Sequence, residues 1–276
     1  MLKTREIKEI LIKVRQGKKG LSKKKPEKKL VLGMKKRAGR SKSSGRVTVR
    51  HRGGGVKRRY RIVDFGQKKI NIPAKVMALE YDPNRTAFLI LLEYEDGEKR
   101  YRLAPHQIKV GDRIVCSEKG EIKTGNRIKL KNIPFGIQVY NIEIMPGRGG
   151  KLVRGAGTSA KVLAVEGKYC HLEMPSKETR KVSLECFASI GQISHPEKRF
   201  EKIGKAGTRR RKGWRPVTRG TVMNPRDHPH GGGEGKTPIG MPHPKTKWGK
   251  PALGVKTRKR RWTDKYIIER RQQTKR

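Results

Sequence analysis

Two histidines in a stretch rich in glycine and proline are the residues best suited to chemistry. His228 and His230 lie there with Asp227 and Glu234. Together with His243, these side chains could bind a transition metal, and Asp227 with His228 could form a general-base pair. The metal hypothesis rests on a His-x-His pair in a chain that offers little rigidity. The general-base hypothesis has no Ser or Cys nucleophile nearby in the sequence, although one could lie nearby in space.

The same stretch, residues 224–237, ends in Gly235, Lys236 and Thr237, like the end of a phosphate-binding P-loop. That motif needs a glycine five positions before its second glycine, and His230 stands there instead. No strand pattern precedes the stretch either. We therefore reject nucleotide hydrolysis by this segment.

Charge indicates the partner. The 276 residues include 71 Lys+Arg and 24 Asp+Glu, a formal net charge of +47. This net charge exceeds what solubility requires, and the like charges would repel one another in a free monomer. We therefore expect a polyanionic partner, and nucleic acid is the usual one. Residues 1–60 hold 23 basic and 3 acidic side chains, 61–200 hold 25 and 16, and 201–276 hold 23 and 5. Two basic arms therefore flank a centre that alone has the apolar residues for a core.

With this partner, the favoured hypothesis is that residues 224–237 order on RNA. Glycine permits a close backbone approach, while Asn and His side chains bond to phosphates, 2′-hydroxyls and base edges. Asp227 and Glu234 would orient His228 or meet base amino groups. An untethered flexible loop is the alternative. The residues of this stretch predicted to bind RNA are Asn224, Arg226, His228, His230 and Lys236.

Three further regions combine cations with glycine or tryptophan. The turn at Gly53–Gly55 would direct backbone NH groups and guanidinium groups at phosphates, with an ordinary solvated hairpin as the alternative. A long basic loop, 146–157, could enter a groove. Trp214, Trp248 and Trp262 lie among cations, and we favour stacking on bases over a role as core anchors. The residues predicted to bind RNA in these regions are Arg46, Arg50, His51, Arg52, Lys57, Arg58, Arg59, Arg61, Arg148, Lys151, Arg154, Arg209, Arg210, Arg211, Lys212, Trp214, Arg215, Arg219, Lys245, Trp248, Lys250, Arg258, Lys259, Arg260 and Arg261.

The cysteines argue against a disulfide framework and a zinc ribbon, because Cys116, Cys170 and Cys186 are odd in number and form no CxxC pair. A reducing compartment fits this count. No run approaches 18 apolar residues, and the beginning of the sequence lacks the apolar core of a signal peptide. We therefore expect no membrane partner.

The central pattern is typical of short β-strands. The first group of predicted strands is 60–65, 73–81, 87–94, 99–103 and 113–116, with 87–92 apolar enough to be buried on both faces. Pro134 and Gly136 interrupt the pattern, and the second group is 137–144, 160–165, 169–174, 180–184 and 187–193. The first group predicts a small barrel of oligonucleotide-binding type, and the second group predicts another small barrel.

The flanks carry weaker patterns. Residues 2–16 have apolar residues at helical spacing and predict a short amphipathic helix. Residues 18–44 should be disordered alone, 196–204 should form one or two helical turns, and no periodicity remains after 205.

Several motifs resemble one family. Asn224–Gly235 is similar to the hallmark of ribosomal protein two of the large subunit, in its bacterial and organellar form. Further matching stretches are Arg50–Gly55, Tyr60–Phe65, Leu79–Arg85, Asp96–Tyr101 and Thr218–Gly220. The resemblance covers about residues 28–276. It departs at the helix-like residues 2–16 and at Arg226, where a small apolar residue is common in the family.

The resemblance implies a mainly β fold, in which a barrel of oligonucleotide-binding (OB) type at 60–125 precedes an SH3-like barrel at 126–200. A basic N-terminal extension, 1–59, and an irregular C-terminal extension, 201–276, complete the expected domains. It also implies primary binding to large-subunit (23S-type) rRNA, contacts with small-subunit (16S-type) rRNA and neighbouring ribosomal proteins, and support of subunit joining, tRNA binding and peptide-bond formation.

On both grounds we expect a structural ribosomal component and no enzyme, with no cofactor, no metal and no catalytic residue. A peptidyl-transferase role is suggested for the family and contested, and His228 matches the residue discussed. We expect a cytoplasmic location in the ribosome, with an organellar ribosome as the alternative.

Overall fold

The computed structural model describes residues 20–34, 39–66, 69–256 and 258–271. The chain forms two compact units. The barrel unit comprises residues up to 34, 58–202 and the residues from 263 onward, and the extension unit comprises 35–57 and 203–262. The helix predicted at 2–16 lies outside the described residues.

A four-stranded antiparallel sheet forms the OB-type barrel. Its strands are β3 (Ala74–Glu80), β4 (Leu89–Tyr94), β5 (Lys99–Leu103) and β6 (Arg113–Ile114), in the order β5-β4-β3-β6. Strand β4 is buried on both faces, as the apolar run predicts, because it lies between two core clusters. Leu89 and Leu91 belong to one cluster, and Ile90 and Leu92 belong to the other.

A seven-stranded sheet forms the SH3-like barrel, in the order β15-β13-β12-β11-β8-β14-β7. Its strands are β7 (Arg127–Lys129), β8 (Gln138–Tyr140), β11 (Ala160–Glu166), β12 (Tyr169–Glu173), β13 (Thr179–Ser183), β14 (Phe187–Ile190) and β15 (Ile267–Glu269). Their inward side chains form a third core cluster around Val139, Val162 and Leu172. The mainly β fold of two successive barrels is thus confirmed.

Two short antiparallel ladders attach the segments that carry cations. Strand β1 (Val31–Gly33) pairs with β2 (Arg59–Arg61), and β9 (Ile142–Glu143) pairs with β10 (Gly150–Leu152). Both ladders belong to the barrel unit. The second closes the base of the basic loop that follows β9.

The helical segments of the described residues are short. They are η1 (Lys28–Leu30), η2 (Leu130–Asn132), η3 (Pro196–Phe200), α2 (Ala206–Arg211), η4 (Gly220–Val222) and η5 (Arg261–Tyr266). The helical turn predicted after residue 196 is η3. Among the described residues, no helix has the length and apolar character that a membrane crossing requires.

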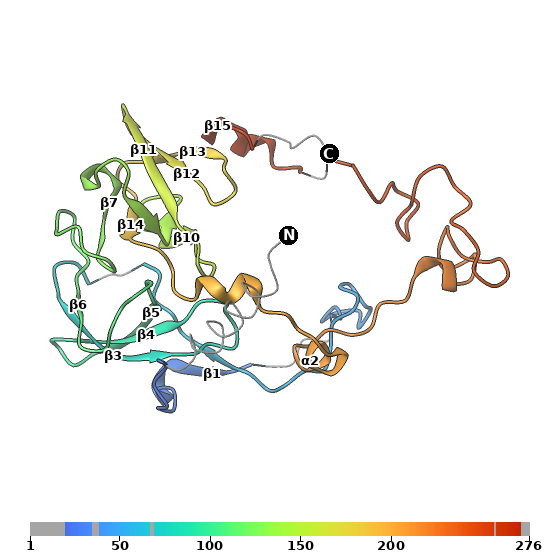
Figure 1. Ribbon diagram of the computed structural model, residues 1–276, viewed down its shortest axis with the longest axis horizontal. Helices are drawn as coiled ribbons and strands as arrows, with labels where there is room; N and C mark the ends of the chain where they lie inside the picture. The colour runs from blue at the N-terminus through green and yellow to red at the C-terminus, as the bar shows by residue number, and fades with distance from the viewer. Residues whose placement is uncertain (1–19, 35–38, 67–68, 257, 272–276) are drawn as a thin grey trace, which may run out of the picture. The chain divides into compact units, whose positions relative to one another are not determined.

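Some of the described strands were not among the predicted ones. Strand β7 precedes Pro134 and pairs with β14, within the range 126–200 expected for the SH3-like barrel. Strand β10 lies inside the predicted loop 146–157 and pairs with β9. Strand β1 forms within the stretch expected to be disordered alone, because β2 satisfies its backbone. Strand β15 lies beyond residue 205, where no period remains, and pairs with β13 at the edge of the sheet (Figure 1).

Candidate nucleic-acid interface

The extension unit is basic, and its described residues form no apolar core. Its sequence holds 26 Lys+Arg and 2 Asp+Glu. Every buried hydrophobic side chain found in the described part of the chain belongs to the barrel unit. What orders the extension unit must therefore be hydrogen bonds, glycine contacts and cation–π contacts.

Backbone hydrogen bonds join its two segments. Gly53 N donates to Gly213 O at 3.1 Å, Val56 N donates to Arg211 O at 3.0 Å, and Arg215 N donates to His51 O at 3.1 Å. This ladder runs beside α2, where the blue and orange segments meet in Figure 1. The NH groups of Gly53 and Val56 therefore bond to the chain itself, so the predicted phosphate turn offers fewer free donors than its sequence indicates.

Two tryptophans of the extension unit hold arginines from its first segment. The Arg52 guanidinium lies 3.6 Å from the centre of the Trp214 ring, and that of Arg50 lies 5.3 Å from the Trp248 ring. Trp248 and Trp262 remain 71% and 67% exposed. A core-anchor role for these two residues is contradicted by that exposure, whereas stacking on a base stays a prediction.

The histidine loop has a defined geometry. His230 N donates to Nδ1 of His228 at 3.0 Å, and Lys245 N donates to Nε2 of His230 at 2.9 Å. The two rings are tilted by 55°, with centroids 4.8 Å apart. Partial burial, followed by the charges of His230, Arg50 and Lys247, lowers the pKa of His228. The ring is therefore neutral at pH 7.

Glycine is required where this loop folds back on itself. A Cβ on Gly231 would lie 2.3 Å from the Asn224 carbonyl oxygen, and one on Gly220 would lie 2.5 Å from Nδ1 of His228. Gly232 N also donates to Met223 O at 3.0 Å. The loop thus packs its backbone against its own turns, which no side chain at these positions would allow.

The alternatives for this loop gain no support from the geometry. No hydrogen bond in the described chain joins the Asp227 carboxylate to His228, as a general-base pair would require. Within that same part of the chain, no three His, Cys, Asp or Glu side chains gather as metal ligands. Lys236 lies in a bend and Thr237 in irregular chain, without the helix that follows a P-loop.

A buried carboxylate shapes the basic loop 146–157. Glu143 Oε1 accepts hydrogen bonds from Arg127 Nη2 at 3.0 Å and Gly149 N at 3.2 Å. Its Oε2 accepts from Gly147 N at 3.1 Å and Phe187 N at 3.2 Å. Arg127 Nη1 donates to Asn141 O at 2.7 Å. The loop's backbone donors are thus used by an internal anion, which fixes the turn and leaves Arg148 exposed.

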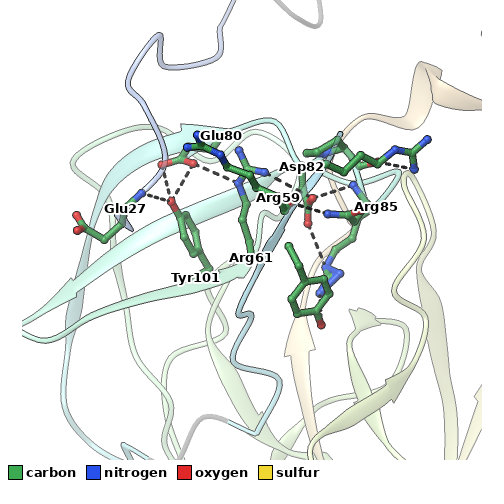
Figure 2. Close-up of polar contacts among 11 residues, drawn as sticks. Glu27, Arg59, Arg61, Glu80, Asp82, Arg85 and Tyr101 are labelled. Carbon is green, nitrogen blue, oxygen red and sulfur yellow. Dashed lines mark hydrogen bonds and ion pairs between the residues drawn. The ribbon is translucent and has the colours of Figure 1, made fainter. Parts of the chain in front are cut away.

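A second buried network includes Arg61 of strand β2 (Figure 2). Glu80 accepts a hydrogen bond from the Tyr101 hydroxyl at 2.9 Å, and its Oε2 lies 3.6 Å from Arg61 Nε. The Tyr101 hydroxyl also accepts a hydrogen bond from Glu27 N at 2.9 Å. Asp82 lies between two cations, 3.7 Å from Arg61 Nη1 and 3.6 Å from Arg85 Nε. The network therefore ties β2 and the chain before β1 to the barrel.

Burial affects protonation in this network. It raises the pKa of Glu80, against the lowering influence of the Tyr101 hydroxyl and Arg61. It also raises the pKa of Tyr101 to about 12. The tyrosine consequently remains a hydrogen-bond donor to Glu80 at any physiological pH.

Arginines also gather on aromatic rings near this network. Arg85 lies 5.6 Å from the centre of the Tyr60 ring and 5.3 Å from that of Phe65. Arg154, from the basic loop, lies 4.5 Å from the Phe65 ring. The structure thereby brings a predicted residue, Arg154, beside the segment that follows β2.

Most of the residues predicted to bind RNA are exposed. Arg61 is the buried exception, 8% exposed and paired with Glu80 and Asp82. The partly buried residues are His51, Arg58, His228, His230 and Lys245. The exposed ones are Arg46, Arg50, Arg52, Lys57, Arg59, Arg148, Lys151, Arg154, Arg209, Arg210, Arg211, Lys212, Trp214, Arg215, Arg219, Asn224, Arg226, Lys236, Trp248, Lys250, Arg258, Lys259, Arg260 and Arg261.

Sequence reasoning missed the carboxylates that position these cations. Glu143 lies between two isoleucines, and Glu80 follows an apolar run in β3. A single acidic residue inside an apolar run is a signal for a buried, paired carboxylate, since an unpaired one would be costly.

Two family models match the chain. Residues 27–116 match Ribosomal Proteins L2, RNA binding N-terminal domain, and residues 123–249 match Ribosomal Proteins L2, C-terminal domain. Together they cover most of the sequence, including both barrels and the histidine loop. The chain therefore belongs to the ribosomal protein L2 family: it is an rRNA-binding structural constituent of the large ribosomal subunit, and its partners are rRNA and ribosomal proteins.

Proposed function

We propose that this protein is a primary binder of large-subunit (23S-type) rRNA whose extension unit shapes RNA near the peptidyl-transferase region. Through that RNA it supports tRNA binding and peptide-bond formation without performing the chemistry itself. It also supports subunit association by contacts with small-subunit (16S-type) rRNA. The ribosome is the cytoplasmic one, with an organellar ribosome as the alternative.

The observation that carries the proposal is the composition of the extension unit. It holds 26 basic side chains and 2 acidic ones, and none of its described hydrophobic side chains is buried. A segment of this kind gains stability when phosphates neutralise its charge and release their counterions. Its exposed arginines and lysines match that role, while its glycines allow backbone to approach RNA closely.

The barrel unit differs in how its cations are used. Lys129 is paired with Glu118 at 2.7 Å and with Glu185 at 2.9 Å, and Arg100 is paired with Glu98 and Asp64. Such lysines and arginines are neutralised within the protein. We therefore assign RNA contacts in the barrel unit to exposed cations at its edges, such as Arg59, Arg148 and Arg154.

The direct test is crosslinking and sequencing of RNA bound to the intact protein in its own cell, with sites mapped to residues. We expect crosslinks from residues 209–261 to large-subunit rRNA close to the catalytic centre. Crosslinks scattered over many cellular RNAs, or confined to rRNA far from that centre, would overturn the proposed location.

A matched pair of variants tests the electrostatic part. Arg226→Gln removes an exposed cation of the histidine loop, and the slope of log affinity against log salt should fall by about 1. Lys129→Gln removes a cation paired with two carboxylates, and that slope should stay unchanged. Equal slopes for both variants would contradict the assignment of binding to the extension unit.

The non-catalytic part is tested with purified, RNA-free protein. We expect no acyl or phosphoryl transfer by this preparation. Activity that disappears in the His228→Ala variant would show instead that the histidine loop is an active site.

A further inference from the structure

The hydrogen bonds of the histidine loop determine where its protons lie. An imidazole nitrogen that accepts a hydrogen bond carries no proton. His228 accepts at Nδ1 from His230 N, and His230 accepts at Nε2 from Lys245 N. Each ring thus accepts at one nitrogen, so the proton of His228 is on Nε2 and that of His230 is on Nδ1.

The His228 ring is also fixed in orientation. Its Nδ1 and Cε1 atoms each lie 2.5 Å from the position that a Cβ on Gly220 would take, so the ring packs directly on the Gly220 backbone. The hydrogen bond from His230 N, 3.0 Å long, prevents the ring from flipping without loss of a backbone partner. The Nε2–H group therefore points in one direction in the RNA-free protein.

Basic side chains act on the His228 ring. Partial burial, His230, Arg50 and Lys247 all oppose a second proton on this ring. The charges of Arg50 and Lys247 also attract an anion. An N–H donor under the influence of an arginine and a lysine suits a phosphate oxygen better than a neutral acceptor.

We propose that His228 is a positioning residue that donates a hydrogen bond from Nε2–H to a phosphate oxygen of RNA, and that it accepts no proton there. The proposal rests on the RNA-binding function proposed above. It implies that neither ring nitrogen is available as a general base, because Nδ1 is occupied by a backbone donor and Nε2 already holds its proton.

The first test is long-range ¹H–¹⁵N NMR of the full-length, RNA-free protein with labelled histidine at pH 7.5. We expect the Nε2–H tautomer for His228 and the Nδ1–H tautomer for His230. His243, an exposed histidine outside the two hydrogen bonds, is the control and should average both tautomers. An averaged pattern at His228, or a proton on its Nδ1, would overturn the proposal without any RNA measurement.

The second test uses amide isosteres, since Asn places its amide near Nδ1 of histidine. His228→Asn keeps an acceptor for His230 N and loses the Nε2–H donor, so affinity for a large-subunit rRNA fragment should fall about tenfold. His243→Asn changes an exposed histidine outside these hydrogen bonds and should bind within about twofold of the unaltered protein. His230→Asn removes the acceptor for Lys245 N and should weaken binding.

The outcomes separate this inference from the proposed function. If the unaltered protein shows no preference for large-subunit rRNA, the proposed function fails. If it binds that rRNA and His228→Asn binds equally well, the inference about His228 fails. If His228→Asn disturbs the amide signals of His230 and Lys245, the shift of the Nε2–H signal on addition of RNA to the unaltered protein decides: no shift would overturn the proposal.

Discussion

In the barrel unit, side chains such as Leu91, Leu172 and Ile193 are removed from water, and the buried charges of Arg127 and Glu143 are paired with each other. In the extension unit, backbone hydrogen bonds, close glycine packing and arginines on tryptophans replace the core. One chain thus orders itself in two ways. The first way is complete within the protein, whereas the second leaves a large excess of positive charge that only a polyanion balances.

The largest expected difference concerns buried charge in the barrel unit. Arg127→Met should lower the free energy of unfolding by about 3–5 kcal/mol, because Glu143 would remain buried without its counterion. Urea denaturation, monitored by far-UV circular dichroism, measures the change in the free energy of unfolding. Lys131→Met is the control, since this lysine and Glu185 are both substantially exposed, and it should cost about 0–1 kcal/mol. Similar losses in both variants would show that burial does not decide the strength of these pairs.

Adding a methyl group to a closely packed glycine of the extension unit should lower stability by an intermediate amount, and only locally. Gly231→Ala places a Cβ 2.3 Å from the Asn224 oxygen and should destabilise the histidine loop by about 1–3 kcal/mol. Faster amide hydrogen exchange at Gly232 would report it, with unfolding of the barrels unchanged. Gly207→Ala, in α2 with open space around it, should be neutral or slightly stabilising. A change in the urea unfolding of the barrels on Gly231→Ala would contradict the prediction that the effect is confined to the histidine loop.

Acid should weaken both units in the same direction, through different histidines. His195 packs on Phe88 with ring centroids 4.5 Å apart. Burial and the charge of Lys198 lower its pKa, despite a contact with the Thr86 carbonyl and the nearby charges of Glu197 and Glu201. A folded-state pKa below the unfolded value of 6.5 means that stability is fully present above pH 6.5 and declines below it. The uptake of one proton on unfolding changes the free energy of unfolding by at most about 1.4 kcal/mol per pH unit.

Urea titrations at pH 7.5 and pH 5 test this sign. His195→Asn tolerates the positive φ of 63° at this position and should flatten the response of the barrel unit. In the extension unit, the pKa of His228 is also lowered, so the protection of the His230 amide, relative to its intrinsic exchange rate at each pH, should decrease over the same range. Stability that rises as the pH falls would contradict the neutral state of both rings.

The smallest expected effect is that of a single cation–π contact. Arg52→Gln removes the guanidinium from Trp214 and should weaken the docking of the two extension segments by about 0.5–1 kcal/mol. Amide exchange at Val56, which donates to Arg211 O, measures that docking. Arg46→Gln removes the same charge at an exposed position without an aromatic partner and should leave the exchange unchanged. If both variants change the exchange of the Val56 amide equally, the loss of charge explains the change and the contact with Trp214 does not.

The sequence was sufficient for features that repeat over several residues. Alternating apolar and polar residues, together with apolar runs, located β3, β4 and β5 closely. A strand of five or more residues is long enough for such a pattern to be recognised in the sequence. Strands β1 and β15 have three residues each and no period, so only their partners reveal them. The pairing of His51–Val56 with residues 211–215 is likewise a long-range property of glycine backbones, invisible to side-chain patterns.

The candidate site was predictable in its residue types more than in their roles. Clustered cations and the histidine loop stood out by composition, and most of the named cations are indeed exposed. The buried state of Arg61 was not foreseeable, because its partners Glu80 and Asp82 come from the far end of β3 and beyond it. Hydrogen-bond direction at His228 also depends on the folded loop, and no local pattern encodes it.

The ladder of β15 on β13 has a topological consequence. Because this ladder returns the chain to the barrel unit after residue 262, the second extension segment is an excursion that leaves the barrel unit and comes back to it. The β1–β2 ladder closes the first segment in the same way. Both segments are therefore tethered at each end, and they meet at an effective concentration set by loop length, as in an intramolecular reaction. A single protease cut within either segment would accordingly leave both pieces attached to the protein, so nicked protein should retain its extension unit where a free tail would be lost.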